Sequence, residues 1–265
     1  MVRIGTGAAG KVSALKYSSM VYYRLTEMIF ARRFEVLCAD PLPGPVAGRD
    51  GERLEFVDES ELQPLFASHG RYYSHAALME GEPGCHRVAV LRGANGDVLS
   101  CGYVSGRLLG GGGPAGREAL RVPWEGGLDI ELCDSELYLW SFWTPPGRRG
   151  RGHYASLLRA LRGLGADIGA RAVSIYCRSD NAASLNGILR AGFERWDRFE
   201  MLRVGQLRFV YSNRFGKRWF LSRGSFALLG GASTGRCTPR ERRKRAGTCP
   251  HCKKEGAAEA APRSC

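Results

Sequence analysis

The stretch PPGRRGRGHYASLL, residues 145–158, constrains the fold more than any other part of the chain. Between Gly147 and Tyr154 it holds three arginines and three glycines, and it then changes into the helical leucine pattern of residues 157–168. A strand-like segment ending in Trp-Thr precedes it. The order of strand, glycine-rich loop and helix start leaves unpaired backbone N–H groups that can hold an anion, and glycines let the backbone approach that anion closely.

The composition of this stretch leaves three interpretations open. It can be a solvated surface turn, an Arg-Gly segment that contacts nucleic acid, or a cradle for the phosphates of a cofactor. Its spacing matches neither the P-loop, which requires a Gly-Lys-Ser/Thr ending, nor the dinucleotide-binding fingerprint. The segments around the loop are needed to choose among the three.

These segments predict an α/β domain over residues 53–213, with a meander of strands first and crossover helices later. Asn95-Gly96 is a strong hairpin signal inside it. Periodicity and turn residues predict, in order, a strand and a helix in 53–66, a hairpin in 86–107, two strands in 128–144, a helix after the loop, a strand at 172–177, a helix in 179–193, and strands at 195–204 and 207–212.

Two motifs together resemble the signatures of the GNAT superfamily of N-acetyltransferases. Arg149–Tyr154 is similar to the acyl-coenzyme A loop of that superfamily, Arg/Gln-x-x-Gly-x-Gly/Ala, with Pro146 three residues before it. Residues 181–193, NAASLNGILRAGF, look like the second signature: an Asn, a Ser three residues later, a helix and then Gly-Phe. One helix and one strand separate the two motifs, as that fold requires. The resemblance covers residues 53–205 and implies the GNAT acyl-CoA acyltransferase fold, an α/β fold with a mixed sheet.

The resemblance implies direct transfer of an acyl group from acetyl-CoA, or another acyl-CoA, to an amine. It implies that the strand before the loop splays from the strand at 172–177, and that backbone groups in the gap hold the pantetheine arm and polarise the thioester carbonyl. The loop would hold the pyrophosphate, and the second motif would contact the arm or organise its own helix. The positions implied for cofactor binding are Phe142, Trp143, Thr144, Arg149, Gly150, Arg151, Gly152, His153, Tyr154, Asn181 and Ser184.

The sequence departs from the superfamily pattern at two positions. Tyr154 replaces the small residue that usually closes the loop, and we expect its side chain to fill or line the edge of the phosphate site. Ile188 stands where the second helix often carries a Tyr that protonates the departing thiolate. That proton must therefore come from another group or from water, or the activity is weak or lost.

An attacking amine has to lose a proton, so the reaction needs a base or a water relay. Alternation along the strand before the loop puts residues 136, 138, 140 and 142 on one face. Superfamily bases often sit on this strand, which makes Glu136 the first candidate and Tyr138 the second, with Glu131 and Asp134 as nearby alternatives. Each of these residues can instead be a surface or packing residue.

The net charge of +13 lies at the two ends of the chain. Residues 1–33 hold six Lys/Arg against one Glu, residues 214–265 hold thirteen against three, and the residues between them hold twenty against twenty-two. The central domain is therefore not a polycationic surface, which argues against nucleic-acid binding by it.

The segments outside the domain divide into three parts. Residues 1–52 contain a predicted helix at 12–33, which either packs on the domain or lies on an anionic membrane surface, and a Pro- and Gly-rich linker. Residues 214–235 form a C-terminal extension, and residues 236–265 are predicted to be a basic disordered tail. We find no secretory signal and no apolar run of roughly 18 residues, which favours a cytoplasmic protein, with the inner membrane face as the site of any peripheral contact.

Cys249 and Cys252 form a Cys-x-x-Cys motif inside the tail. A zinc site would need further ligands from His251, Cys237 or Cys265, whose spacing is irregular. We therefore predict no metal site, and we expect no disulfide framework among the nine cysteines.

Two classes of function agree with these patterns. The first is an N-acyltransferase that moves an acyl group from coenzyme A to an amine of a small molecule or a sugar. The second is a catalytically weak or inactive GNAT-fold binding module whose basic ends contact membrane or nucleic acid. The intact Arg149–Gly152 loop and the helix that follows Asn181 favour the first class, whereas Tyr154 and Ile188 favour the second.

Overall fold

The computed structural model describes residues 29–43, 51–69, 84–110, 120–124, 128–204, 207–212, 216–221 and 225–227. Its main element is a nine-stranded sheet. The strands of this sheet are β1 (Ile29–Ala39), β2 (Arg53–Val57), β3 (His86–Arg92), β4 (Val98–Ser105), β7 (Glu136–Trp143), β8 (Ala172–Arg178), β9 (Glu194–Val204), β10 (Leu207–Ser212) and β11 (Gly216–Leu221).

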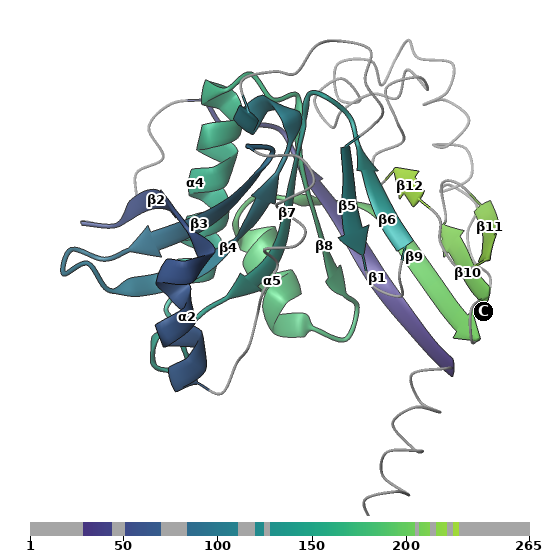
Figure 1. Cartoon of the computed structure of the whole chain (residues 1–265), viewed down its shortest axis with the longest axis horizontal. Helices are drawn as coiled ribbons and strands as arrows, with labels where there is room; N and C mark the ends of the chain where they lie inside the picture. Colours follow the sequence, from purple (N-terminus) through teal and green to yellow (C-terminus); the bar gives the residue numbers. More distant parts are fainter. Residues whose placement is uncertain are drawn as a thin grey trace, which may run out of the picture.

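The sheet fans across the molecule from β2 to β11 in the order β11-β10-β9-β1-β8-β7-β4-β3-β2 (Figure 1). All neighbouring strands are antiparallel except β7 and β8, which are parallel. A crossover helix has to connect such a parallel pair, and α4 (His153–Asp167) does so. The glycine-rich loop is the link between β7 and α4.

Two apolar cores cover the two faces of the sheet. On one face pack α4 and α5 (Ala182–Arg190), with Leu157, Leu161 and Ile188 fully buried. On the other face pack α2 (Glu59–Ser68) and a small second sheet made of β5 (Leu120–Trp124), β6 (Leu128–Leu132) and β12 (Ser225–Ala227). The main sheet therefore separates two environments, and β7 and β8 run through its middle.

The strands and helices predicted for residues 53–66, 86–107 and 128–212 are confirmed, with small changes in the bounds, whereas strand β5 (Leu120–Trp124) was not predicted. The prediction of a helix over residues 12–33 is wrong at its C-terminal end, because residues 29–33 begin β1. β1 is hydrogen-bonded to β8 on one side and to β9 on the other. Its buried residues alternate between the two cores, with Phe34 on one face and Leu37 on the other. Strand pairing on both sides thus outweighs the local helical spacing.

The described part of residues 1–52 is therefore not a separate appendage, because β1 is an inner strand of the main sheet. Residues 1–28 and the tail 236–265, including Cys249 and Cys252, lie outside the described residues. Within the described residues, no three His, Cys, Asp or Glu side chains gather as a metal site would require, and no helix is long and apolar enough to cross a membrane.

A bulge in β7 corrects the predicted alternation of that strand. Ser141 has a φ of 51°, and the register with β4 shifts so that two residues of β7 oppose Gly102. Residues 136, 138 and 140 share one face, as predicted, but Phe142 turns to the α4 and α5 face and Trp143 returns to the opposite one. Gly102 is required here, because a Cβ at this position would lie 2.3 Å from the Phe142 ring.

Candidate functional site

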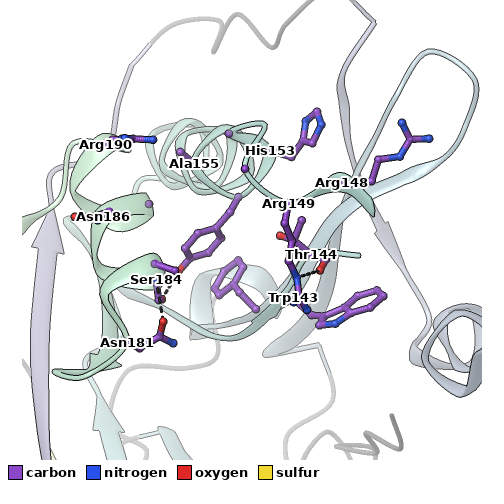
Figure 2. Close-up of a pocket in the computed structure, with 16 residues that line it drawn as sticks. Trp143, Thr144, Arg148, Arg149, His153, Ala155, Asn181, Ser184, Asn186 and Arg190 are labelled. Atoms are coloured by element: carbon purple, nitrogen blue, oxygen red, sulfur yellow. Dashed lines mark hydrogen bonds between the residues drawn. The ribbon is translucent and has the colours of Figure 1, made fainter. Parts of the chain in front are cut away.

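A pocket of about 470 Å³ lies where the glycine-rich loop meets α5 (Figure 2). The end of β7, the first turn of α4 and one face of α5 form its walls. Its lining residues are Phe142, Trp143, Thr144, Arg148, Arg149, Gly150, Gly152, His153, Tyr154, Ala155, Asn181, Ala183, Ser184, Asn186, Gly187 and Arg190. The structure thus brings together most of the positions implied for cofactor binding, although they come from three separate elements.

The loop takes the shape that its glycines predict. A short 3-10 turn, Pro146–Arg148, follows β7, and the chain then passes through Gly150 and Gly152 at φ values of 74° and 84°. These values belong to the left-handed region, which favours glycine over other residues. Gly152 is the N-cap of α4, so the N-terminus of a fifteen-residue helix faces the pocket. Backbone N–H groups and the helix dipole both favour an anion at this place.

Charge in the pocket is positive only, since none of its lining residues is acidic. Arg148 forms an ion pair with Asp97 at 2.6 Å, outside the lining. Arg149 donates from Nε to the Thr144 carbonyl oxygen at 3.1 Å, which holds the loop against the end of β7. Arg151 is exposed and is not a lining residue, so the structure separates it from the other implied positions.

His153, the first residue of α4, pairs with a residue that the sequence reasoning missed. Its Nδ1 lies 2.9 Å from Oε1 of Glu52, and the two side chains are only 11% and 4% exposed. Glu52 stands just before β2, so the contact links the predicted linker to the loop. No motif signals this pair, because the two residues are far apart in the chain.

The N-terminus of α5 forms the opposite wall of the pocket. Asn181 is its N-cap and accepts a hydrogen bond from the Ser184 backbone N–H at 3.1 Å. The hydroxyls of Ser184 and Tyr154 are 3.2 Å apart and form a hydrogen bond between α5 and α4. Asn181 and Ser184 thus organise the start of α5, which is one of the two roles predicted for them. Both residues also line the pocket.

Tyr154 lines the pocket, as expected for a bulky residue at the end of the loop. Its ring lies 5.4 Å from the Phe142 ring and packs over Gly187. A Cβ at Gly187 would be 2.4 Å from the Tyr154 ring. The absence of a side chain at Gly187 on α5 therefore makes room for the Tyr154 ring on α4. Burial raises the pKa of the Tyr154 phenol above its usual range, so the phenol stays protonated at neutral pH.

The gap predicted between β7 and β8 is present next to this pocket. Their shared register runs from Glu136 and Ala172 to Leu139 and Ile175 and then ends. Beyond that point β7 stays paired with β4 as far as Trp143, whereas β8 stays paired with β1 as far as Arg178. The two strands therefore separate just before the bulge.

Glu136 and Tyr138, the two candidate bases, do not line the pocket. Both are buried on the opposite face of the sheet, at 2% and 1% exposure. The Ser174 hydroxyl donates to Oε1 of Glu136 at 2.5 Å. Burial raises the pKa of Glu136 to about 7, against smaller lowering effects from Ser174 and a backbone hydrogen bond of Cys133. Glu136 can therefore accept a proton near neutral pH.

A buried polar row beside Glu136 was not predicted. His86, Ser105, Tyr138 and Ser174 are register partners across β3, β4, β7 and β8. The Ser105 hydroxyl lies 2.8 Å from Nδ1 of His86 and accepts a hydrogen bond from Nε1 of Trp140 at 2.8 Å. Alternation along each strand predicts which face each of these residues occupies. The row itself could not be predicted, because it depends on which strands lie next to each other in the sheet.

Comparisons with solved structures find mostly N-acetyltransferases. A GCN5-related N-acetyltransferase from Sphaerobacter thermophilus is 15% identical, with a TM-score of 0.42 and a match that covers 80% of this chain and 59% of that one. A GCN5-related N-acetyltransferase from Kribbella flavida is 14% identical, with a TM-score of 0.43 and coverages of 70% and 63%. The aminoglycoside antibiotic 6'-N-acetyltransferase AAC(6')-Ih from Acinetobacter baumannii is 13% identical, with a TM-score of 0.36 and coverages of 55% and 92%.

The chain is similar to these acetyltransferases at low identity and with TM-scores of 0.36 to 0.43. The matches span less than two thirds of the first two of these proteins. No protein-family model matches the sequence, and no curated protein matches it. At these identities the likeness concerns the fold alone.

Proposed function

We propose that the protein is an acyltransferase that moves an acyl group from acetyl-CoA, or another acyl-CoA, to an amine of a small molecule or sugar. One observation carries the proposal. An α-helix N-terminus preceded by Gly150 and Gly152 in left-handed conformation opens into a pocket without acidic lining residues, directly beside the gap between β7 and β8.

The pocket residues fit the chemistry of such a donor. Gly150, Gly152 and the first turn of α4 would hold the pyrophosphate through backbone N–H groups, with Arg149 adding positive charge. The gap next to Phe142 would take the pantetheine arm. When bound, the donor supplies an activated acyl group as a thioester. Backbone donors at the bulge of β7 would polarise its carbonyl oxygen.

Glu136 is the residue that we assign to the amine proton. It lies on the face opposite the pocket, three residues before the last register pair of β7 and β8, which is about 10 Å along a strand. An amine that reaches the gap from this face would lose its proton to Glu136 through a water relay. Its pKa of about 7 suits that role at neutral pH.

A substitution in the loop tests donor binding. Gly152→Asp would place a negative charge at the helix N-terminus, and we expect calorimetry to show about a tenfold or greater loss of acetyl-CoA affinity. Gly147→Asp is the matched control, because Gly147 lies in the same loop, does not line the pocket and would leave an added Cβ with no atom within 4 Å. Circular dichroism checks folding. Equal affinity of the folded Gly152→Asp protein and the control would refute the site.

The second class of function is favoured by Tyr154 and Ile188. The Tyr154 ring occupies space in the pocket that an acyl-CoA donor would need. Ile188 is fully buried, and its aliphatic side chain cannot protonate a departing thiolate. A binding module would bind acetyl-CoA without transferring its acyl group to any of a panel of amines. Mass spectrometry of the acceptors separates the two classes. Contact with membrane through residues 12–28, the part of the predicted helix that precedes β1, stays a prediction that vesicle co-sedimentation can test.

A further inference from the structure

Coenzyme A carries two separate anionic groups, the pyrophosphate and a phosphate on the 3′ oxygen of its ribose. The ribose stands between them, so a pocket that recognises the whole molecule needs positive charge at two positions. The proposed function places the pyrophosphate at the loop. A second position must therefore come from cations elsewhere in the pocket.

The cations near the loop already have partners. Arg148 is paired with Asp97 at 2.6 Å, and Nε of Arg149 is bound to the Thr144 carbonyl oxygen. His153 faces Glu52 at 2.9 Å. Arg149 can still offer its remaining N–H groups to a phosphate close to Gly150. These side chains all lie on the loop side of the pocket.

Arg190, the last residue of α5, lies on the other side of the pocket (Figure 2). Its side chain is exposed. Its carbonyl oxygen accepts a long hydrogen bond of 3.4 Å from Arg159, but within the described part of the chain its guanidinium pairs with no carboxylate. A cation that lines a pocket without a carboxylate partner is available to a ligand anion.

Asn186 accompanies Arg190 on the same face of α5. The two residues are four apart, which makes them neighbours along a helix, and both line the pocket. The Asn186 amide provides two N–H donors beside the guanidinium. α5 contains no acidic residue, so nothing on this helix competes for Arg190.

We infer that Arg190, assisted by Asn186, forms a subsite for the ribose 3′-phosphate of coenzyme A. This inference rests on the proposed function, because it takes the pyrophosphate to lie at the loop. A guanidinium can make two parallel hydrogen bonds to a phosphate, which gives the subsite selectivity for that group over a hydroxyl. The protein should therefore discriminate coenzyme A from its analogue without the 3′-phosphate.

Calorimetry with coenzyme A and with 3′-dephospho-coenzyme A tests the subsite. We expect the wild-type chain to bind coenzyme A about tenfold more tightly than the analogue, the factor typical of one charge-assisted contact. Arg190→Gln should lose that factor for coenzyme A and bind the analogue as the wild type does. Asn186→Ala should show the same pattern with a smaller loss. Arg149→Gln should weaken both ligands equally, because both carry the pyrophosphate.

Arg87→Gln is the matched control, since Arg87 is an exposed arginine that does not line the pocket. It should change neither affinity. Equal losses for both ligands in Arg190→Gln, or no loss for either, would overturn the subsite while leaving the proposed function intact. A wild-type chain that binds neither ligand would instead overturn the proposed function and the subsite with it.

Discussion

Replacing Glu136 with Gln should remove a large pH dependence from the folding free energy. Glu136 is 2% exposed, and burial raises its pKa from 4.5 to about 7. The folded protein thus binds this proton more tightly than the unfolded chain. The difference between a pKa of 4.5 and one of about 7 corresponds to about 3 kcal/mol, at roughly 1.4 kcal/mol for a tenfold change in proton affinity.

The sign of the effect follows from the direction of the shift. Because the folded pKa is raised, the contribution of Glu136 to stability is fully present below about pH 4.5 and is lost as pH rises through about 7. A Gln side chain does not titrate, so this loss disappears in the variant. Relative to Glu136→Gln, the wild type should therefore lose about 3 kcal/mol of unfolding free energy between acidic and mildly alkaline pH.

Urea unfolding of both proteins at several values from about pH 4.5 to about pH 8 measures this difference. Asp167→Asn is the control, because Asp167 is an exposed carboxylate at the end of α4. Its unfolding free energy should follow the wild type over the whole range. If the curve for Glu136→Gln also runs parallel to the wild type, the Glu136 carboxyl is not held at a raised pKa, and its assignment as a base near neutral pH loses its physical ground.

Three further outcomes are expected. In activity assays, Glu136→Gln should lower kcat by about 10²–10⁴-fold at neutral pH and by less at alkaline pH, with unchanged acetyl-CoA affinity; an unchanged kcat would exclude a role as base. Gly187→Ala should cost about 1–2 kcal/mol in urea unfolding, because its Cβ would lie 2.4 Å from the Tyr154 ring, and adding Tyr154→Ala should cancel that steric cost; additive losses would contradict the contact. Removal of residues 236–265 should leave the midpoint of thermal unfolding and the acetyl-CoA affinity unchanged; a lower midpoint would show that the tail is structural.

Most of the element order of the domain, all but strand β5, could be predicted from sequence because each signal is local. Asn95-Gly96 closes a hairpin, and Gly152 begins a helix whose leucines repeat at helical spacing. β1 could not be found in this way. Its residues continue a helical pattern, and what makes them a strand is the pairing with β8 and β9, which come more than a hundred residues later.

The candidate site divides along the same line. The loop and Asn181 were predicted because their spacing encodes a local geometry, a left-handed glycine before a helix and an N-cap. Glu52 and Arg190 were missed, since one meets His153 from a distant segment and the other enters the pocket only through the packing of α5 beside α4. Helical spacing from Asn186 to Arg190 was visible in the sequence, but nothing local shows which face of that helix meets a pocket.

The bulge at Ser141 explains why the proposed donor and the proposed base belong to different faces of one strand. Without the extra residue, Phe142 would share the face of Glu136 and Trp140, and the face toward α4 and α5 would lose the ring that packs on Tyr154. Gly102 makes the bulge possible by leaving space for Phe142. Because β7 and β8 separate just before this point, the two faces meet there and nowhere else along their shared register. An acyl donor held by the loop and an amine approaching from the Glu136 side would therefore react in this gap, which is why proton transfer to Glu136 would need a water relay rather than direct contact.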